Sequence, residues 1–238
     1  MYLMDNGAMI ASSSKPDCRF EISIDPLYYA NTPYVNPGRS GIVPGLDGLH
    51  GFAVFARDAA GMGSCTEPQF VLIVPDRPTS PYQGKAAKLP GIINPAFYDE
   101  GGNGAAYSDS KGNFFNKPGK KPFRPGEDAD AAGNIIGRVV AGEWLKYTVD
   151  IESAGDYRAV LNYGTPVRGR DHRLYLFIDG IPEPAGIFTL KPHQEPHWKC
   201  SEKAVIGSVR LPQGRHRLVL VPVGAFNFSN LEFTRIDK

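Results

Sequence analysis

Long hydrophobic runs and net charge are both scarce in this sequence of 238 residues. No uninterrupted aliphatic or aromatic run is longer than that of Phe70–Val74, whereas a membrane-spanning helix needs about 20 apolar residues. The sequence therefore predicts no membrane-spanning helix. The 26 Lys and Arg side chains oppose 25 Asp and Glu side chains, for a formal net charge of +1. A charge so near zero gives no overall attraction to nucleic acid or an anionic membrane, so we expect neither as a partner.

Cysteine is also scarce, because the 3 cysteines are too few for a disulfide scaffold. Cys18 and Cys65 fall within one candidate domain, where either a disulfide or two buried thiols would fit. The segment Met1–Gly7 lacks both a basic stretch and a sustained apolar run, so it does not predict a secretory signal. Either the protein is cytosolic or the natural chain begins upstream.

Turn-forming residues are abundant, with 27 Gly and 21 Pro, and no pattern predicts a helix of three turns. Short strands are predicted instead from alternating or continuously apolar runs. The predicted strands are Cys18–Ile24, Phe52–Ala56, Gln69–Val74, Trp144–Ile151, Tyr157–Tyr163, Arg173–Ile178, Ala204–Leu211, Arg217–Val221 and Leu231–Ile236. Because each strand has one face to bury and a second sheet is the simplest cover, the sequence predicts an all-β protein made of β-sandwiches.

A proline-rich segment divides the chain into two predicted domains. Pro75, Pro78, Pro81 and Pro90 are mixed with small polar residues, and prolines do not sustain the hydrogen-bonded ladder of a sheet. We therefore expect one domain over residues 1–75, a linker over residues 76–90 and a second domain over residues 91–238.

The first domain resembles a bacterial Ig-like domain. The resemblance is carried by Tyr2–Gly7, by Phe20–Ile24 and by Gly48–Gly61, which reads Gly-Leu-His-Gly-Phe-Ala-Val-Phe-Ala-Arg-Asp-Ala-Ala-Gly. It implies a partial Ig-like β-sandwich that acts as a spacer. Because Tyr2 already lies on what resembles an internal strand, we expect an upstream region with the missing strands, a signal peptide and a catalytic domain.

The second domain resembles family 6 carbohydrate-binding modules over about residues 89–238. Four stretches carry this resemblance, namely Tyr98–Asp109, Phe123–Glu127, Ala141–Val149 and Ala225–Leu231. It implies a β-jelly-roll sandwich that binds a polysaccharide or oligosaccharide without catalysis. It also implies a secreted or cell-surface protein, in which a monomeric module tethers an attached glycoside hydrolase or related enzyme to its substrate.

Candidate binding residues follow from the chemistry of sugars. A protein holds a neutral sugar by placing an aromatic ring against its C–H face and by hydrogen bonding to its hydroxyl groups. Trp198 lies in a proline-containing loop, and the resemblance makes it the stacking platform; the alternative is a cap on the core of the loop. Asn227 and Asn230 match the stretch that binds sugar hydroxyls in the family, but either could equally fix a turn.

The sequence departs from the family pattern at several positions. Arg138 stands where the family usually has a second aromatic residue, so one stacking surface is lost and an acidic glycan becomes a reasonable ligand. Val140 replaces a hydroxyl-binding Asp of some members. Asn94 and Ala96 replace the Glu residues that help to bind a structural calcium ion, and whether calcium binds stays open, because such a site needs several oxygen ligands.

No residue pattern predicts an active site, so we expect that the chain is not an enzyme. Glu127, Asp128 and Asp130 are interpreted as solvated turn residues rather than as a glycosidase pair. His193, His197 and Cys200 have a metal-like spacing but lack a fourth ligand. Arg168, Arg170, His172 and Arg173 are interpreted as a solvated basic loop. The alternative to sugar binding is a degenerate jelly roll with a structural or adhesive role, which Arg138 favours.

Overall fold

The computed structural model divides into two compact units, Met1–Val74 and Pro75–Lys238. The residues that the structure describes are 1–5, 8–14, 34–35, 42–43, 48–66, 69–73, 77–109, 123–140, 143–181, 183–193 and 197–236. None of these residues is in an α-helix, and the only helices among them are two single 3₁₀ turns, η1 (Tyr82–Gly84) and η2 (Pro95–Phe97). No helix in this part of the chain is therefore long and apolar enough to cross a bilayer.

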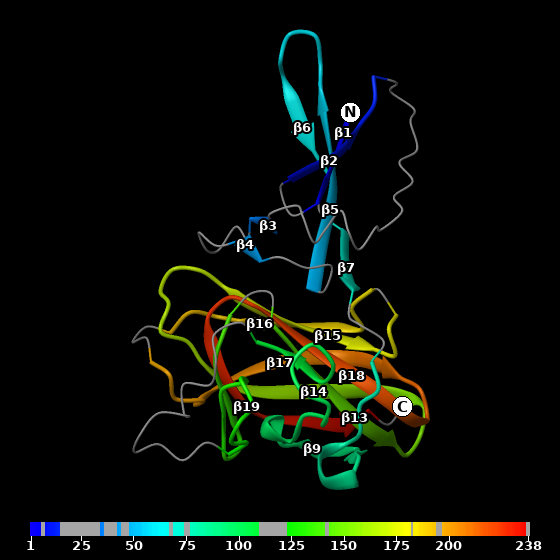
Figure 1. Cartoon of the computed structure of the whole chain (residues 1–238), viewed down its shortest axis with the longest axis vertical. Coiled ribbons are helices and arrows are strands. Elements are labelled where there is room, and N and C mark those ends of the chain that lie inside the picture. Colours follow the sequence, from blue (N-terminus) through cyan, green and yellow to red (C-terminus); the bar gives the residue numbers. More distant parts are fainter. Residues whose placement is uncertain are drawn as a thin grey trace. The chain divides into compact units, whose positions relative to one another are not determined.

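The first unit contains a five-stranded sheet in the order β2-β1-β5-β6, with β7 also paired to β5 (Figure 1). Its strands are β1 (Tyr2–Asp5), β2 (Ala8–Ser12), β5 (Gly48–Arg57), β6 (Gly63–Cys65) and β7 (Gln69–Ile73), and a separate pair is formed by β3 (Tyr34–Val35) and β4 (Ile42–Val43). Strand β5 contains the predicted strand Phe52–Ala56, and β7 matches the predicted strand Gln69–Val74 as far as Ile73, beyond which Val74 lies outside the described residues. The predicted strand over residues 18–24 lies outside the described residues, and the Ig-like fold of this unit stays a prediction.

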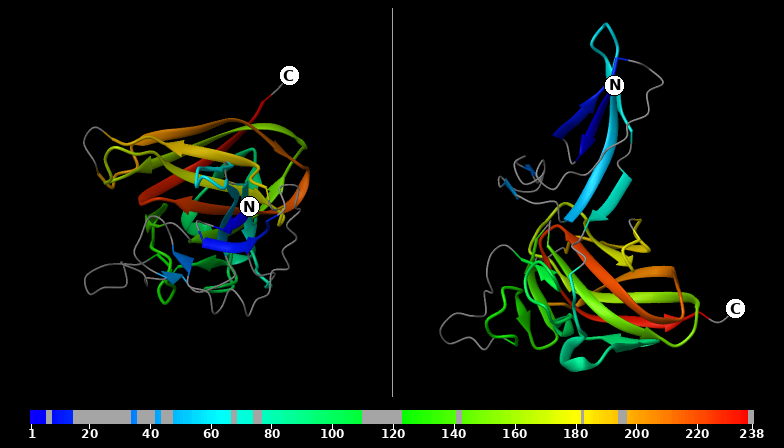
Figure 2. Two further views of the ribbon diagram at one scale, coloured as in Figure 1. Left: turned by 90° about the horizontal axis from the view of Figure 1, so that it is seen from above. Right: turned by 45° about the vertical axis from the view of Figure 1, so that its right-hand side comes forward.

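The second unit is a sandwich of two six-stranded sheets, seen as two layers in Figure 1 and Figure 2. One sheet has the order β10-β13-β18-β15-β16, with β8 also along β13; the other has the order β11-β12-β19-β14-β17, with β9 also along β19. The strands are β8 (Ala87–Leu89), β9 (Gly91–Ile93), β10 (Tyr107–Ser108), β11 (Ala131–Ala132), β12 (Ile135–Val139), β13 (Trp144–Ile151), β14 (Gly155–Gly164), β15 (His172–Ile178), β16 (Gly186–Leu190), β17 (Glu202–Leu211), β18 (Gly214–Val223) and β19 (Phe226–Arg235).

The core of this sandwich forms between the two sheets. On β13 the core contains every second residue, Leu145, Tyr147, Val149 and Ile151, as the alternation of side chains along a strand requires. Facing strands contribute buried aromatic rings, among them Phe228 and Phe233 of β19. The predicted all-β class, with a β-jelly-roll sandwich in the C-terminal part of the chain, is confirmed.

The expected linker differs from what the structure shows. Residues 77–90 belong to the second unit, where β8 runs parallel to β13 and Leu89, paired with Ile151, is 1% exposed. The ring of Tyr82 stacks on Phe97 with 4.6 Å between the ring centroids. The prolines do not prevent this pairing, because they flank a three-residue strand at the margin of a sheet, where few ladder bonds are needed.

Candidate functional site

Trp198 lies on the connection between β16 and β17, and its side chain is exposed. The residue retains 43% of its surface area, so it does not act as a buried cap on this loop. The loop backbone is held tightly against the end of β14. A Cβ atom on Gly164 would lie 2.1 Å from the carbonyl oxygen of Lys199 and 2.9 Å from the carbonyl carbon of Trp198. Only glycine therefore lets the two backbones approach this closely.

Asn227 connects the Trp198 loop to a second strand. It lies in β19 opposite Gly164, and its Nδ2 donates a hydrogen bond of 2.8 Å to the carbonyl oxygen of Trp198. Its Oδ1 accepts a 2.7 Å bond from the backbone N–H of Arg138. The sequence left two roles open for Asn227, and the structure shows the side chain bonded to two backbone groups, so that one amide joins Trp198 and Arg138.

Arg138 lies at an irregularity of β12. Its φ angle is +54°, in the left-handed region, and the register of β12 against β19 shifts between Ile136 and Val139. The side chain is 50% exposed, and its Nε lies 3.9 Å from Oδ2 of the buried Asp130. Asn227 thus bonds to the backbones of Trp198 and Arg138, whose side chains are both exposed. Val140, in contrast, is 6% exposed and offers no side chain to this surface.

Asn230 is not brought to this group by the fold. It has a φ angle of +45°, and its Oδ1 accepts a 3.2 Å bond from Nδ2 of Asn134, which lies in the turn between β11 and β12. This bond joins two side chains, so neither of the two roles that the sequence left open for Asn230 is decided by it.

Two histidines form the interior of the Trp198 loop. The rings of His193 and His197 stack at 4.5 Å, and His193 also stacks on Tyr163 at 5.5 Å. Burial first, and then the neighbouring His197, lower the pKa of His193. In the part of the chain that the structure describes, no three or more His, Cys, Asp or Glu side chains are placed to hold a metal ion. The metal-like spacing of His193, His197 and Cys200 therefore does not form a site.

Asn94 and Ala96, at the positions where the family has calcium-binding Glu residues, do not fit a calcium ion. Oδ1 of Asn94 accepts a 3.0 Å bond from the N–H of Ala96, which caps the short helix η2. Nδ2 of Asn94 donates to the carbonyl oxygen of Gly133 at 3.4 Å. Ala96 is fully buried and has no side-chain oxygen. Because calcium requires six or more oxygen ligands, one engaged amide does not provide the donor set.

The acidic residues after Pro125 are not the solvated turn residues that the sequence analysis expected. Oε2 of Glu127 accepts a 2.6 Å bond from the hydroxyl of Tyr98, and Oε1 accepts a 3.0 Å bond from Nε of Arg124. Asp130 is 6% exposed. Burial, followed by repulsion from Asp130 and Asp128, raises the pKa of Asp109 to about 7. The local pairing of Glu127 with Arg124 and the long-range bond from Tyr98 together decide the surroundings of Glu127.

The predicted basic loop divides into exposed and buried members. Arg168, Arg170 and Arg173 are exposed, but His172 is 1% exposed, and burial, followed by the charge of Arg170, lowers its pKa. The loop begins at Thr165, whose carbonyl oxygen accepts a 3.1 Å bond from the N–H of His197. The basic loop therefore starts beside the loop that carries Trp198.

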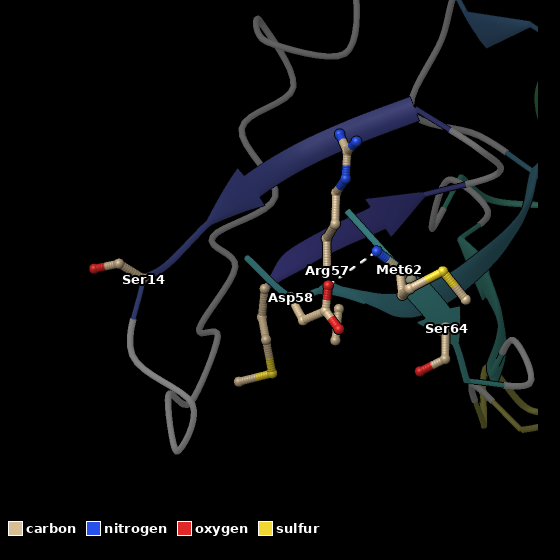
Figure 3. A pocket seen from close by; sticks show the side chains of 8 residues that line it. Ser14, Arg57, Asp58, Met62 and Ser64 are labelled. Atoms are coloured by element: carbon tan, nitrogen blue, oxygen red, sulfur yellow. Dashed lines mark hydrogen bonds between the residues drawn. The ribbon is translucent and has the colours of Figure 1, made fainter. Parts of the chain in front are cut away.

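A hollow of about 510 Å³ lies in the first unit (Figure 3) and includes none of the predicted site residues. It surrounds the turn between β5 and β6, where Oδ1 of Asp58 accepts a 2.9 Å bond from the N–H of Met62. Nε of Arg57 donates to the carbonyl oxygen of Gly61 at 3.2 Å. Arg57 and Asp58 thus both form hydrogen bonds within the turn that contains them. Cys65 is an exposed free thiol, and Cys18 lies outside the described residues.

No family model and no curated protein matches the chain. Solved structures do match it. One is CsCBM6-3 from Clostridium stercorarium in complex with cellobiose, at 14% identity and a TM-score of 0.47, with 64% of this chain and 99% of that chain covered. Another is a carbohydrate-binding module of Cellvibrio mixtus lichenase 5A in complex with cellotriose, at 21% identity and a TM-score of 0.36, with 43% and 78% covered.

Proposed function

We propose that the second unit is a non-catalytic carbohydrate-binding module whose site contains Trp198, Asn227 and Arg138. The observation that carries this proposal is the single amide of Asn227, which bonds to the backbones of both Trp198 and Arg138. It ties an exposed indole and an exposed guanidinium to one point of the sandwich. An indole matches the C–H face of a pyranose, and guanidinium N–H groups match its oxygens.

The rigidity of this arrangement supports a binding role. The backbone contact with Gly164 and the two bonds of Asn227 hold the loop before any ligand arrives. A platform that is already ordered loses less conformational entropy when it binds. A sugar platform needs this property, because a single stacked ring contributes little affinity.

The wider role follows from the sequence resemblance of the second unit. In this proposal the module is monomeric and binds a polysaccharide or oligosaccharide. It belongs to a secreted or cell-surface protein and tethers an upstream glycoside hydrolase or related enzyme to its substrate. Tethering raises the effective concentration of the enzyme at the polymer without any new catalytic group.

Affinity electrophoresis of the full chain against a panel of neutral and acidic polysaccharides tests the proposal. Trp198→Ala is expected to abolish retardation in the gel that retards the wild type. Phe97→Ala is the matched control, because Phe97 is also 43% exposed and lies on η2, and it is expected to leave retardation unchanged.

Two outcomes would contradict the proposal. Retardation that survives Trp198→Ala would place the binding site elsewhere. If no polysaccharide retards the wild type, the second candidate is favoured, namely a jelly roll with a structural or adhesive role. The feature that favours this second candidate is Arg138 itself, which stands where the family resemblance implies a second aromatic residue.

A further inference from the structure

The side chain of Arg138 gives the candidate site a positive charge, which a neutral ligand would not pair with. Its guanidinium is 50% exposed, although the backbone of the residue is fixed in a left-handed conformation by the bond to Asn227. A non-glycine residue in this conformation is strained, and strain of this kind is concentrated at functional sites. The fold therefore holds a cation at a defined point next to the Trp198 loop.

The ion pair of Arg138 is compatible with a second anion. Nε lies 3.9 Å from Oδ2 of Asp130, at the long end of the range for an ion pair. Guanidinium has five N–H donors in a planar fork, which matches the two oxygens of a carboxylate or the oxygens of a sulfate. Asp130 is buried beside Arg138, so it holds the guanidinium from the protein side while half of the side chain faces solvent.

Further cations lie on the loop that carries Trp198 and on the loop that begins at Thr165. Lys199 follows Trp198 directly and is exposed. Arg168 and Arg170 are exposed on the loop that begins at Thr165, which is bonded to His197. The acid on that loop, Asp171, is already paired with Lys191 at 2.5 Å. Three exposed cations, Lys199, Arg168 and Arg170, therefore lie on these two loops, together with the exposed Glu202 beside His193.

We propose that the ligand is an acidic glycan, whose sugar ring stacks on Trp198 while its carboxylate or sulfate pairs with Arg138. This inference rests on the proposed function and specifies the class of ligand for the same site. Lys199, Arg168 and Arg170 add long-range attraction for a polyanion, which salt screens, whereas the direct pair with Arg138 is screened less.

Isothermal titration calorimetry with matched polymer pairs tests this inference on the full chain. Polygalacturonate is compared with its methyl ester, and dextran sulfate with dextran, so that the two pairs distinguish a carboxylate from a sulfate. The wild type is expected to bind one acidic polymer at least about tenfold more tightly than its neutral partner, as one charge-assisted hydrogen-bonded pair allows.

Three variants locate the effect. Arg138→Met is expected to erase the preference for the acidic polymer, and Arg138→Lys to retain part of it, because lysine keeps the charge but lacks the planar fork. Arg158→Met is the matched control. Arg158 is an exposed arginine of β14 six residues before Gly164, about 20 Å along the strand, and its replacement is expected to retain the preference.

The outcomes separate this inference from the proposed function. Equal binding of acidic and neutral polymers, with loss of both in Trp198→Ala, would overturn the acidic ligand and leave sugar binding intact. No binding of any of the four polymers would overturn the acidic ligand, whereas the proposed function is overturned only if the electrophoresis panel also shows no retardation. Acidic binding that survives Trp198→Ala, or that falls equally in Arg138→Met and Arg158→Met, would indicate general attraction of a polyanion and would also overturn the inference.

Discussion

Replacement of Arg124 by methionine is expected to destabilise the second unit strongly. Arg124 is 5% exposed, and its guanidinium donates to the carbonyl oxygens of Tyr98 and Asp99. It also pairs with Glu127 at 2.9 Å and lies 3.7 Å from the ring centroid of Tyr98. Methionine fills a similar volume but supplies none of the donors, so two buried carbonyls and a carboxylate lose a partner.

The size of this effect follows from these contacts. Removing one partner of a fully buried ion pair costs about 3–5 kcal/mol. Because the Glu127 side chain is 27% exposed, water replaces part of the lost pairing, and the lower end of the range applies. We therefore expect the free energy of unfolding to fall by about 3 kcal/mol, which for a urea slope of about 2–3 kcal/mol/M moves the midpoint down by about 1 M or more.

Tryptophan fluorescence during urea unfolding measures the second unit selectively. The chain has 2 tryptophans, Trp144 and Trp198, and both lie in the second unit. Arg158→Met provides the control for loss of an exposed arginine and is expected to change the free energy of unfolding by less than about 0.5 kcal/mol.

A double-mutant cycle with Glu127→Gln assigns the energy to the pair. The coupling between Arg124 and Glu127 is expected to exceed about 1 kcal/mol, because the two side chains are in direct contact. A loss below about 1 kcal/mol for Arg124→Met would refute the reasoning, since it would mean that water reaches the abandoned groups at no cost.

Four further predictions concern the loop, the histidines and calcium. Gly164→Ala places a Cβ 2.1 Å from the carbonyl oxygen of Lys199, so it is expected to weaken glycan binding and to lower the free energy of unfolding by about 1–3 kcal/mol. Gly207→Ala is the control, because the space around its Cβ is open. Equal glycan binding by the two variants would contradict the prediction. Burial, and then the neighbouring His197, lower the pKa of His193 in the folded chain. Below about pH 6.5 the unfolded chain therefore binds a proton at His193 more readily than the folded chain does. The stability that neutral His193 contributes is complete above that pH and is lost as the pH falls below it. Thermal melts of His193→Phe from pH 5 to 8 are expected to show a smaller fall at low pH than the wild type, and an unchanged pH dependence would argue against this role. His216 has the opposite sign: burial alone would lower its pKa, but its bonds to the Gln213 carbonyl and to Asp179 raise it, so His216→Ala is expected to lose more stability at pH 5.5 than at pH 8, as urea unfolding at both pH values would show. Because Asn94 and Ala96 do not fit calcium, a chelator is expected to leave the melting temperature of the full chain unchanged, and a fall of several degrees would show that calcium binds elsewhere in the chain.

Much of the fold could be predicted from the sequence because its signals are local. Alternation of apolar and polar residues along 144–151, 157–163 and 204–211 marks strands β13, β14 and β17 within a few residues. Asp179 and Gly180 both adopt positive φ angles, in a turn that their residue types favour. These features need only neighbouring residues, so no knowledge of the tertiary structure is required.

The features that the sequence could not supply depend on residues far apart in the chain. Strands β17 and β18 follow each other closely in the chain, as the strands of a hairpin do, but they lie in opposite sheets. Residues 87–89 join a sheet because β13 has an edge beside them with which they pair. Arg124 is buried because its guanidinium donates hydrogen bonds to the carbonyl oxygens of Tyr98 and Asp99, about 25 positions earlier.

The candidate site shows the same division. The family resemblance, together with the chemistry of sugars, selected Trp198, Arg138, Asn227 and Asn230 as residues suited to a sugar or an acidic group. Only the tertiary structure placed Asn227 between Trp198 and Arg138 and left Asn230 with Asn134. The physical reason is that a residue's chemistry is fixed by its side chain, whereas its partners are fixed by how distant strands pair and pack.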